Sequence, residues 1–152
     1  MTRISAFPQV LIVEDQTEVA QMLTDLLRQA GYDAAAATTG DDALALAAAH
    51  RPGFVLLDLT PGRDGIQVLR ELHALDPELP VIILTGAGSP DQAREAMKNG
   101  AADFFTKPFD NQELLASIAD AMANRPALRA RLERPADTRA TNLAVKRAYT
   151  FK

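Results

Sequence analysis

The 152-residue sequence contains no cysteine. This absence excludes disulfide bonds and cysteine-ligated metal sites, so any metal ion must be held by oxygen ligands or by the two histidines. No stretch has the roughly 20 consecutive apolar residues that a membrane-spanning helix needs, and residues 1–8 lack the apolar core of a signal peptide. We therefore expect a cytoplasmic protein without a membrane segment.

Charge is distributed unevenly along the chain, although the net charge is only −4. Residues 1–124 carry 8 Lys/Arg against 18 Asp/Glu, a net charge of −10, whereas residues 125–152 carry 8 against 2, a net charge of +6. The length suits one domain with a core and is short for two. We expect one acidic domain over residues 1–124 and a basic linker or tail over residues 125–152, without a complete output domain.

The basic tail contains one segment of helical spacing, residues 127–133, which lies between Pro126 and Pro135. The composition of the tail favours a solvated linker. Docking of the tail to a partner or to nucleic acid is the alternative. The acidic domain itself does not favour nucleic acid binding.

Short apolar runs alternate with segments of helical period between residues 10 and 123. The runs, at 10–13, 54–57, 81–84 and 104–105, are too short and too rich in β-branched or aromatic residues for buried helices. Between them, apolar residues recur at helical spacing. The five helical faces are marked by Val19, Met22, Leu23, Leu26 and Leu27; by Ala43, Leu44, Leu46 and Ala47; by Ile66, Leu69, Leu72 and Leu75; by Ala93, Ala96 and Met97; and by Leu114, Leu115, Ile118 and Met122. This alternation is typical of a parallel sheet covered by helices.

Residues 33–38, Asp-Ala-Ala-Ala-Ala-Thr, conflict with this pattern because alanine prefers helices. Only a few residues separate Gly31 from Gly40, so the context favours a short strand. This strand completes five βα units. Gly31, Pro77 and Gly100 are placed as helix stop signals.

Polar side chains follow the apolar runs, at the point where each predicted strand ends. Glu14-Asp15 follow the first run, Asp58 the second, Thr85 the third and Lys107 the last. The ligand crevice of an open parallel sheet lies outside the carboxyl ends of its strands. Four strands therefore deliver three carboxylates, a hydroxyl and an ammonium group to one edge.

Clustered carboxylates repel one another, and a cation between them relieves this repulsion. Mg²⁺ suits such a site because it binds a few carboxylates, keeps several waters and completes its shell with phosphate oxygens. A phosphoryl group needs charge neutralisation, which Mg²⁺ and a lysine supply. A carboxylate can form an acyl phosphate, so Asp58, with Lys107 in reach, is the candidate nucleophile.

Each of these residues also has an ordinary structural interpretation. Glu14-Asp15 would cap a helix, Asp58 would belong to a turn, Thr85 would end a strand, and Lys107 would be a solvated charge. The joint pattern favours the functional site, because four independent coincidences would otherwise be needed. His50 and His73 are expected at the surface and not as ligands.

Over about residues 9–123 the chain resembles the receiver domains of two-component response regulators. The resemblance rests on Glu14-Asp15 after a Val-Leu-Ile-Val strand, on Asp58-Leu-Thr-Pro-Gly-Arg-Asp-Gly65, on Thr85-Gly86, and on Ala102-Asp-Phe-Phe-Thr-Lys-Pro-Phe109. Each motif is weak alone, and together, in this order and each at a strand end, they are highly specific. The expected fold is a doubly wound α/β domain with a five-stranded parallel sheet of order 2-1-3-4-5, the flavodoxin-like receiver fold.

The resemblance implies a role for each site residue. Asp58 would accept the phosphoryl group, Asp15 would bind Mg²⁺ directly, Glu14 through water, and Thr60 through its backbone carbonyl. Thr85 would be the switch hydroxyl, Phe104 the aromatic residue that changes rotamer with it, and Lys107 the phosphoryl-binding lysine. The Lys107–Pro108 peptide corresponds to one that is cis in this family. Thr60, Arg63 and Ala87 depart from the commonest family pattern beside the site, so the dephosphorylation rate is not predicted.

The predicted function is a signalling switch rather than an enzyme. A sensor histidine kinase or phosphotransfer protein would donate the phosphoryl group. The response would leave through the face made by the fourth helix, fifth strand and fifth helix, where a homodimer or a protein partner would form. The main alternative is the receiver part of a longer DNA-binding transcription factor. A phosphatase of another α/β family would want a carboxylate at position 60, and a flavin phosphate would be repelled by the acidic cluster.

Overall fold

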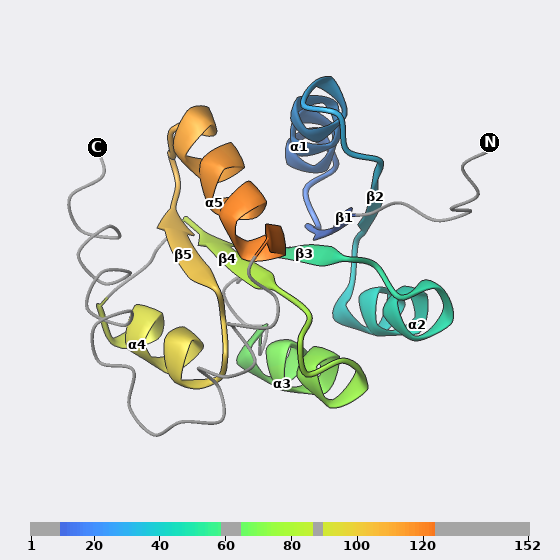
Figure 1. Ribbon diagram of the computed structural model, residues 1–152, viewed down its shortest axis with the longest axis vertical. Coiled ribbons are helices and arrows are strands. Elements are labelled where there is room, and N and C mark those ends of the chain that lie inside the picture. Colours follow the sequence, from blue (N-terminus) through green and yellow to red (C-terminus); the bar gives the residue numbers. More distant parts are fainter. Residues whose placement is uncertain (1–9, 59–64, 87–89, 124–152) are drawn as a thin grey trace.

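The computed structural model describes residues 10–58, 65–86 and 90–123 of the chain. Within these residues, five strands form one sheet with helices on both of its faces (Figure 1). The strands are β1 (Val10–Val13), β2 (Ala34–Ala37), β3 (Phe54–Asp58), β4 (Val81–Thr85) and β5 (Asp103–Thr106). The helices are α1 (Thr17–Gln29), α2 (Gly40–His50), α3 (Gly65–Leu75), α4 (Pro90–Lys98) and α5 (Asn111–Ala123).

The strand order is β2-β1-β3-β4-β5, and every neighbouring pair is parallel. In Figure 1, α1 and α5 lie on one side of the sheet, and α2, α3 and α4 lie on the other. The predicted doubly wound α/β fold and its strand order are therefore confirmed. Because all strands are parallel, their carboxyl ends share one edge of the sheet.

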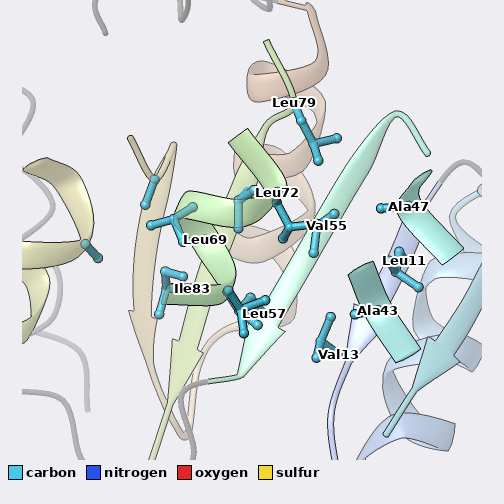
Figure 2. Close-up of a cluster of buried hydrophobic side chains, with 14 of the residues drawn as sticks. Leu11, Val13, Ala43, Ala47, Val55, Leu57, Leu69, Leu72, Leu79 and Ile83 are labelled. Atoms are coloured by element: carbon cyan, nitrogen blue, oxygen red, sulfur yellow. The ribbon is translucent and has the colours of Figure 1, made fainter. Parts of the chain in front are cut away.

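A hydrophobic core lies on each face of the sheet. On β1, Leu11 and Val13 face the core beneath α2, α3 and α4, which Figure 2 shows, whereas Val10 and Ile12 face the core beneath α1 and α5. Successive strand residues point to opposite faces, so a sheet covered on both sides needs apolar residues at every position. The same rule places Phe104 and Phe105 on opposite faces.

The alanine strand β2 lies at the edge of the sheet and pairs with β1 along its whole length, from Val10 opposite Ala34 to Val13 opposite Ala37. The strand predicted over residues 33–38 is therefore confirmed over its four alanines. Backbone pairing with a buried neighbour outweighs the small helix preference of each alanine.

His73 is half-buried, which differs from the surface position expected for it. Its Nε2 lies 2.9 Å from the carbonyl oxygen of Leu79 and its Nδ1 lies 3.4 Å from that of Asn99. Nearby, Arg70 Nε donates to the Asn99 side-chain oxygen at 2.8 Å. Polar side chains of α3 therefore hold the residue that follows α4. Two of these partners are backbone carbonyls, which residue type does not reveal.

The predicted stop signals coincide with observed helix ends. Gly31 and Gly100 follow α1 and α4 in the left-handed region, with φ of 99° and 98°. After α1, the amide of Gly31 donates to Arg28 O at 3.0 Å and that of Tyr32 to Leu27 O at 2.9 Å. These two bonds define a Schellman motif, which a left-handed residue makes possible.

Replacing Gly31 by alanine should lower the free energy of unfolding by about 1–2 kcal/mol, because a Cβ disfavours the left-handed region. Gly86→Ala is the matched control: a Cβ at either glycine meets no atom within 4 Å, and only Gly31 has a positive φ. Urea denaturation of both variants measures the difference. Equal stabilities for the two would contradict this assignment of strain.

Candidate functional site

The carboxyl edge of the sheet gathers polar residues from four strands. Glu14 and Asp15 follow the last residue of β1, Asp58 ends β3, Thr85 ends β4, and Lys107 follows the last residue of β5. The strand register brings these ends level, with Val13 opposite Leu57 and Thr85 opposite Thr106. The structure thus brings together residues from segments far apart in the chain.

Three carboxylates form a compact acidic cluster at this edge. One ligand oxygen from each of Glu14, Asp15 and Asp58 lies within 4.8 Å of the other two. Glu14 is buried, Asp58 is half-buried and Asp15 is exposed. The cluster therefore has one side turned to solvent and one side set against the protein.

The ammonium group of Lys107 lies between two of these carboxylates. Its Nζ is 3.2 Å from Glu14 Oε1 and 3.4 Å from Asp58 Oδ1. The side chains of Glu14 and Asp58 are 1% and 9% exposed, so water screens these two ion pairs far less than it screens surface pairs. Lys107 therefore offsets part of the repulsion within the cluster.

Both carboxylate oxygens of Glu14 have a partner. Oε1 contacts Lys107, and Oε2 accepts a hydrogen bond of 3.1 Å from the backbone amide of Gln16. Burial raises the pKa of Glu14 above its ordinary value, and the Asp58 carboxylate raises it further; the Gln16 amide and the Lys107 ammonium oppose this rise. The balance leaves ionised Glu14 at a cost to the folded state.

Thr85 and Phe104 lie on the face of the sheet that α4 covers. Phe104 is fully buried in the core that contains Ala93 and Ala96 of α4, and Thr85 is 2% exposed. Thr85 lies two residues after Ile83 of the same core, so its side chain leaves the sheet on that side. The Thr85 carbonyl accepts a hydrogen bond of 2.7 Å from the backbone amide of Lys107.

The Lys107–Pro108 peptide bond is cis, as predicted. Thr60, expected to contribute a backbone carbonyl to a metal ion, lies outside the described residues, and so do Arg63 and Ala87.

The ion pair between Glu14 and Lys107 and the hydrogen bond from the Gln16 amide to Glu14 are not predictable from the sequence. The two members of the pair are 93 positions apart, and no local pattern links them. The available signal is the position of Glu14 directly after four consecutive apolar residues, a position that favours burial of its side chain.

Comparison with known proteins identifies a family. The family model described as "Response regulator receiver domain" matches residues 10–119. Sporulation initiation phosphotransferase F of Bacillus subtilis is 37% identical over 107 residues, covering 70% of this chain and 86% of that protein. The C4-dicarboxylate transport transcriptional regulatory protein DctD of Rhizobium meliloti is 35% identical over 123 residues, covering 80% of this chain and 27% of that protein.

Solved structures agree with this family. A response regulator receiver domain from Clostridium thermocellum has a TM-score of 0.73 at 30% identity, covering 80% of this chain and 99% of that one. NtrX from Brucella abortus also has a TM-score of 0.73 at 30% identity, covering 81% of this chain and 29% of that one.

The chain therefore belongs to the family of response-regulator receiver domains, which act in two-component signal transduction. The predicted family is confirmed. The chain spans about a quarter of the length of the two DctD proteins that it matches, 27% and 26%. In the described part of the chain, no helix has the length and apolar character needed to cross a membrane.

The raised pKa of Glu14 predicts a pH-dependent stability. A carboxyl group whose pKa is raised by folding is more easily ionised in the unfolded chain, so its charge costs stability. This cost is absent below the ordinary value of 4.5 and grows as the pH rises through the folded-state pKa. In EDTA, the melting temperature of Glu14→Gln relative to wild type should therefore increase from about pH 4 to about pH 8.

Glu71→Gln, at an exposed glutamate of α3, is the control for this comparison. Thermal denaturation of the three proteins at matched ionic strength gives the measurement. A relative melting temperature of Glu14→Gln that falls over the same pH range would show that ionised Glu14 stabilises the fold, against this account.

Proposed function

We propose that this domain is a phosphorylation switch whose phosphoacceptor is Asp58. The observation that carries the proposal is the contact of the Asp58 carboxylate with Lys107 Nζ at 3.4 Å, beside two further carboxylates at the carboxyl edge of the sheet. An ammonium at this distance can neutralise the negative charge of an incoming phosphoryl group. The neighbouring acidic groups provide a place for a second positive charge.

The residues of the acidic cluster fit Mg²⁺, because three carboxylate oxygens within 4.8 Å are the hard ligands that this ion prefers. We assign Asp15 and Asp58 as direct ligands, Thr60 as a ligand through its backbone carbonyl, and Glu14 as a ligand through water. The exposure of Asp15 and the occupied oxygens of Glu14 support this division. When bound, Mg²⁺ supplies charge neutralisation for phosphate oxygens.

In the proposed reaction, a carboxylate oxygen of Asp58 attacks the phosphorus of a phosphohistidine on a histidine kinase or phosphotransfer protein. The new P–O bond forms an acyl phosphate, while the P–N bond breaks and its electron pair stays on the donor imidazole. Lys107 holds a phosphoryl oxygen throughout. Attack of water on phosphorus later restores the Asp58 carboxylate and releases inorganic phosphate.

Acetyl phosphate with Mg²⁺ should add one phosphoryl group to the wild-type protein and none to Asp58→Asn, because an amide cannot form an acyl phosphate. Intact-mass spectrometry measures the addition. Asp42→Asn, at an exposed aspartate of α2, is the control that should be phosphorylated like wild type. EDTA should suppress the reaction. Phosphorylation of Asp58→Asn to the wild-type level would remove Asp58 from the role.

We further propose that Thr85 and Phe104 relay phosphorylation to the face made by α4, β5 and α5. The Thr85 hydroxyl would bind a phosphoryl oxygen, and its displacement would change which rotamer of Phe104 packs beneath α4. Phe104 is fully buried, so the relay requires exchange between this position and one turned outward. A phosphoryl group that favours one state a hundredfold contributes about 2.7 kcal/mol, so the two states must be close in energy.

Thr85→Ala should accept the phosphoryl group yet lose the response of the α4-β5-α5 face, whereas Thr85→Ser, which keeps the hydroxyl, should retain it. Amide chemical shifts on this face, recorded with and without a beryllofluoride phosphoryl mimic, give the measurement. Shift changes of the same size in Thr85→Ala and in wild type would exclude the relay.

Further assignments follow from this function. The protein acts as a switch, and its only chemistry is its own phosphorylation and dephosphorylation, in the cytoplasm. The α4-β5-α5 face is the proposed site of homodimerisation or of a downstream protein. With a net charge of −10 over residues 1–124, the domain is not expected to bind nucleic acid itself.

A second candidate function is the receiver part of a longer DNA-binding transcription factor. The observation in its favour is the partial coverage of two relatives whose names describe transcriptional regulatory proteins. A reading frame that continues past Lys152 into a DNA-binding domain would select this candidate. A stop codon directly after Lys152 would select the stand-alone switch.

A further inference from the structure

Helix α1 borders an open groove that also reaches the start of α5. Met22, the one large hydrophobic side chain among the described residues that is exposed, is 52% exposed and lines this groove. The groove runs along α1 from Glu18 to Gln29, includes Leu26, and is bordered by Asn111 at the start of α5. Met22 and Leu26 are four residues apart and form one ridge. An occupant of the groove would therefore meet an apolar strip along a helix.

Acidic groups border this strip, and none of the described residues that line the groove is Lys or Arg. Glu18 precedes Met22 by one helical turn. Asp25 lies beside the strip, one turn after Gln21, and its Oδ1 accepts a hydrogen bond of 2.9 Å from the Gln21 side chain. A segment complementary to this groove would therefore carry apolar side chains with cationic side chains on either side of them.

The basic tail, residues 125–152, contains apolar residues flanked by cationic residues in this way. Within residues 127–133, Leu128 and Leu132 are four positions apart and would share one face of a helix. Arg129 and Arg131 lie between them, and the tail as a whole carries a net charge of +6. The two leucines therefore complement the apolar strip of the groove, and the arginines complement its acidic border.

The topology also places the tail within reach. Helices α1 and α5 cover the same face of the sheet (Figure 1). Each follows a strand of the parallel sheet and runs back across it, so their carboxyl ends lie toward the same edge. The tail leaves α5 after Ala123, at the edge where α1 ends with Gln29. Residues 124–127 can span at most about 14 Å, and a tether this short gives an effective concentration in the millimolar range.

We propose that residues 127–133 dock as a short helix in the α1 groove of the same molecule, with Leu128 and Leu132 on Met22 and Leu26, and with arginines beside Glu18 and Asp25. The docked helix covers the exposed strip without requiring a second protein. Its ion pairs are exposed to solvent, so salt weakens the docking. The proposal does not depend on which residue accepts a phosphoryl group.

The absence of cysteine permits a direct test on the full 152-residue chain. A nitroxide attached at Ala136→Cys should broaden the amide signals of Met22 and Leu26 in ¹⁵N-labelled protein, and the reduced label should not. Leu128→Asp combined with Leu132→Asp should abolish the broadening, and high salt should reduce it. Leu143→Asp, a substitution in the same tail outside the docking segment, should leave it unchanged. Equal melting temperatures establish that all variants are folded.

Two outcomes would overturn the proposal. Broadening that is absent, or that survives Leu128→Asp with Leu132→Asp, would show that this segment does not occupy the groove. A mixing experiment tests for a second copy of the chain. Protein that carries the nitroxide but no ¹⁵N is mixed with ¹⁵N-labelled protein that lacks the nitroxide, and broadening in this mixture would show that a second copy of the chain is the occupant.

Discussion

The geometry of the site depends on the ion pairs that the Lys107 ammonium forms with Glu14 and Asp58. Three carboxylates within 4.8 Å of one another repel, and Lys107 is the cationic side chain that the described structure places against two of them. Its own position comes from the end of β5, whereas Glu14 and Asp58 come from β1 and β3. The strands from β1 through β3 and β4 to β5 must therefore pair before the contact exists.

The same residue also connects the acidic cluster to the strand that carries Thr85. The side chain of Lys107 reaches Glu14 and Asp58, while its backbone amide donates to the Thr85 carbonyl at 2.7 Å. A change of charge at Asp58 and a change of position at Thr85 thus act on one short segment. This shared segment makes a relay from the acidic cluster toward α4 mechanically reasonable, since Phe104 lies three residues before Lys107 and packs beneath that helix.

The sequence predicted the sheet well because its signals are local. Apolar runs of two to four residues predicted strands that are buried on both faces, and even the alanine run of β2 was recognisable from the spacing of Gly31 and Gly40. Polar residues after each run located the edge of the sheet. The partners of Glu14 and of His73 were not predictable, because they depend on Lys107 at a distance of 93 positions and on backbone carbonyls such as that of Leu79. Such contacts arise only from the packed tertiary structure.

The central claim, that the carboxylate beside Lys107 carries the phosphoryl group, can be tested by chemical trapping. Borohydride reduces an acyl phosphate to an alcohol, so a phosphorylated aspartate becomes homoserine, and peptide mass mapping locates it. After phosphorylation with Mg²⁺ present, homoserine should appear at position 58 alone. Homoserine at position 15 with none at position 58 would contradict the account.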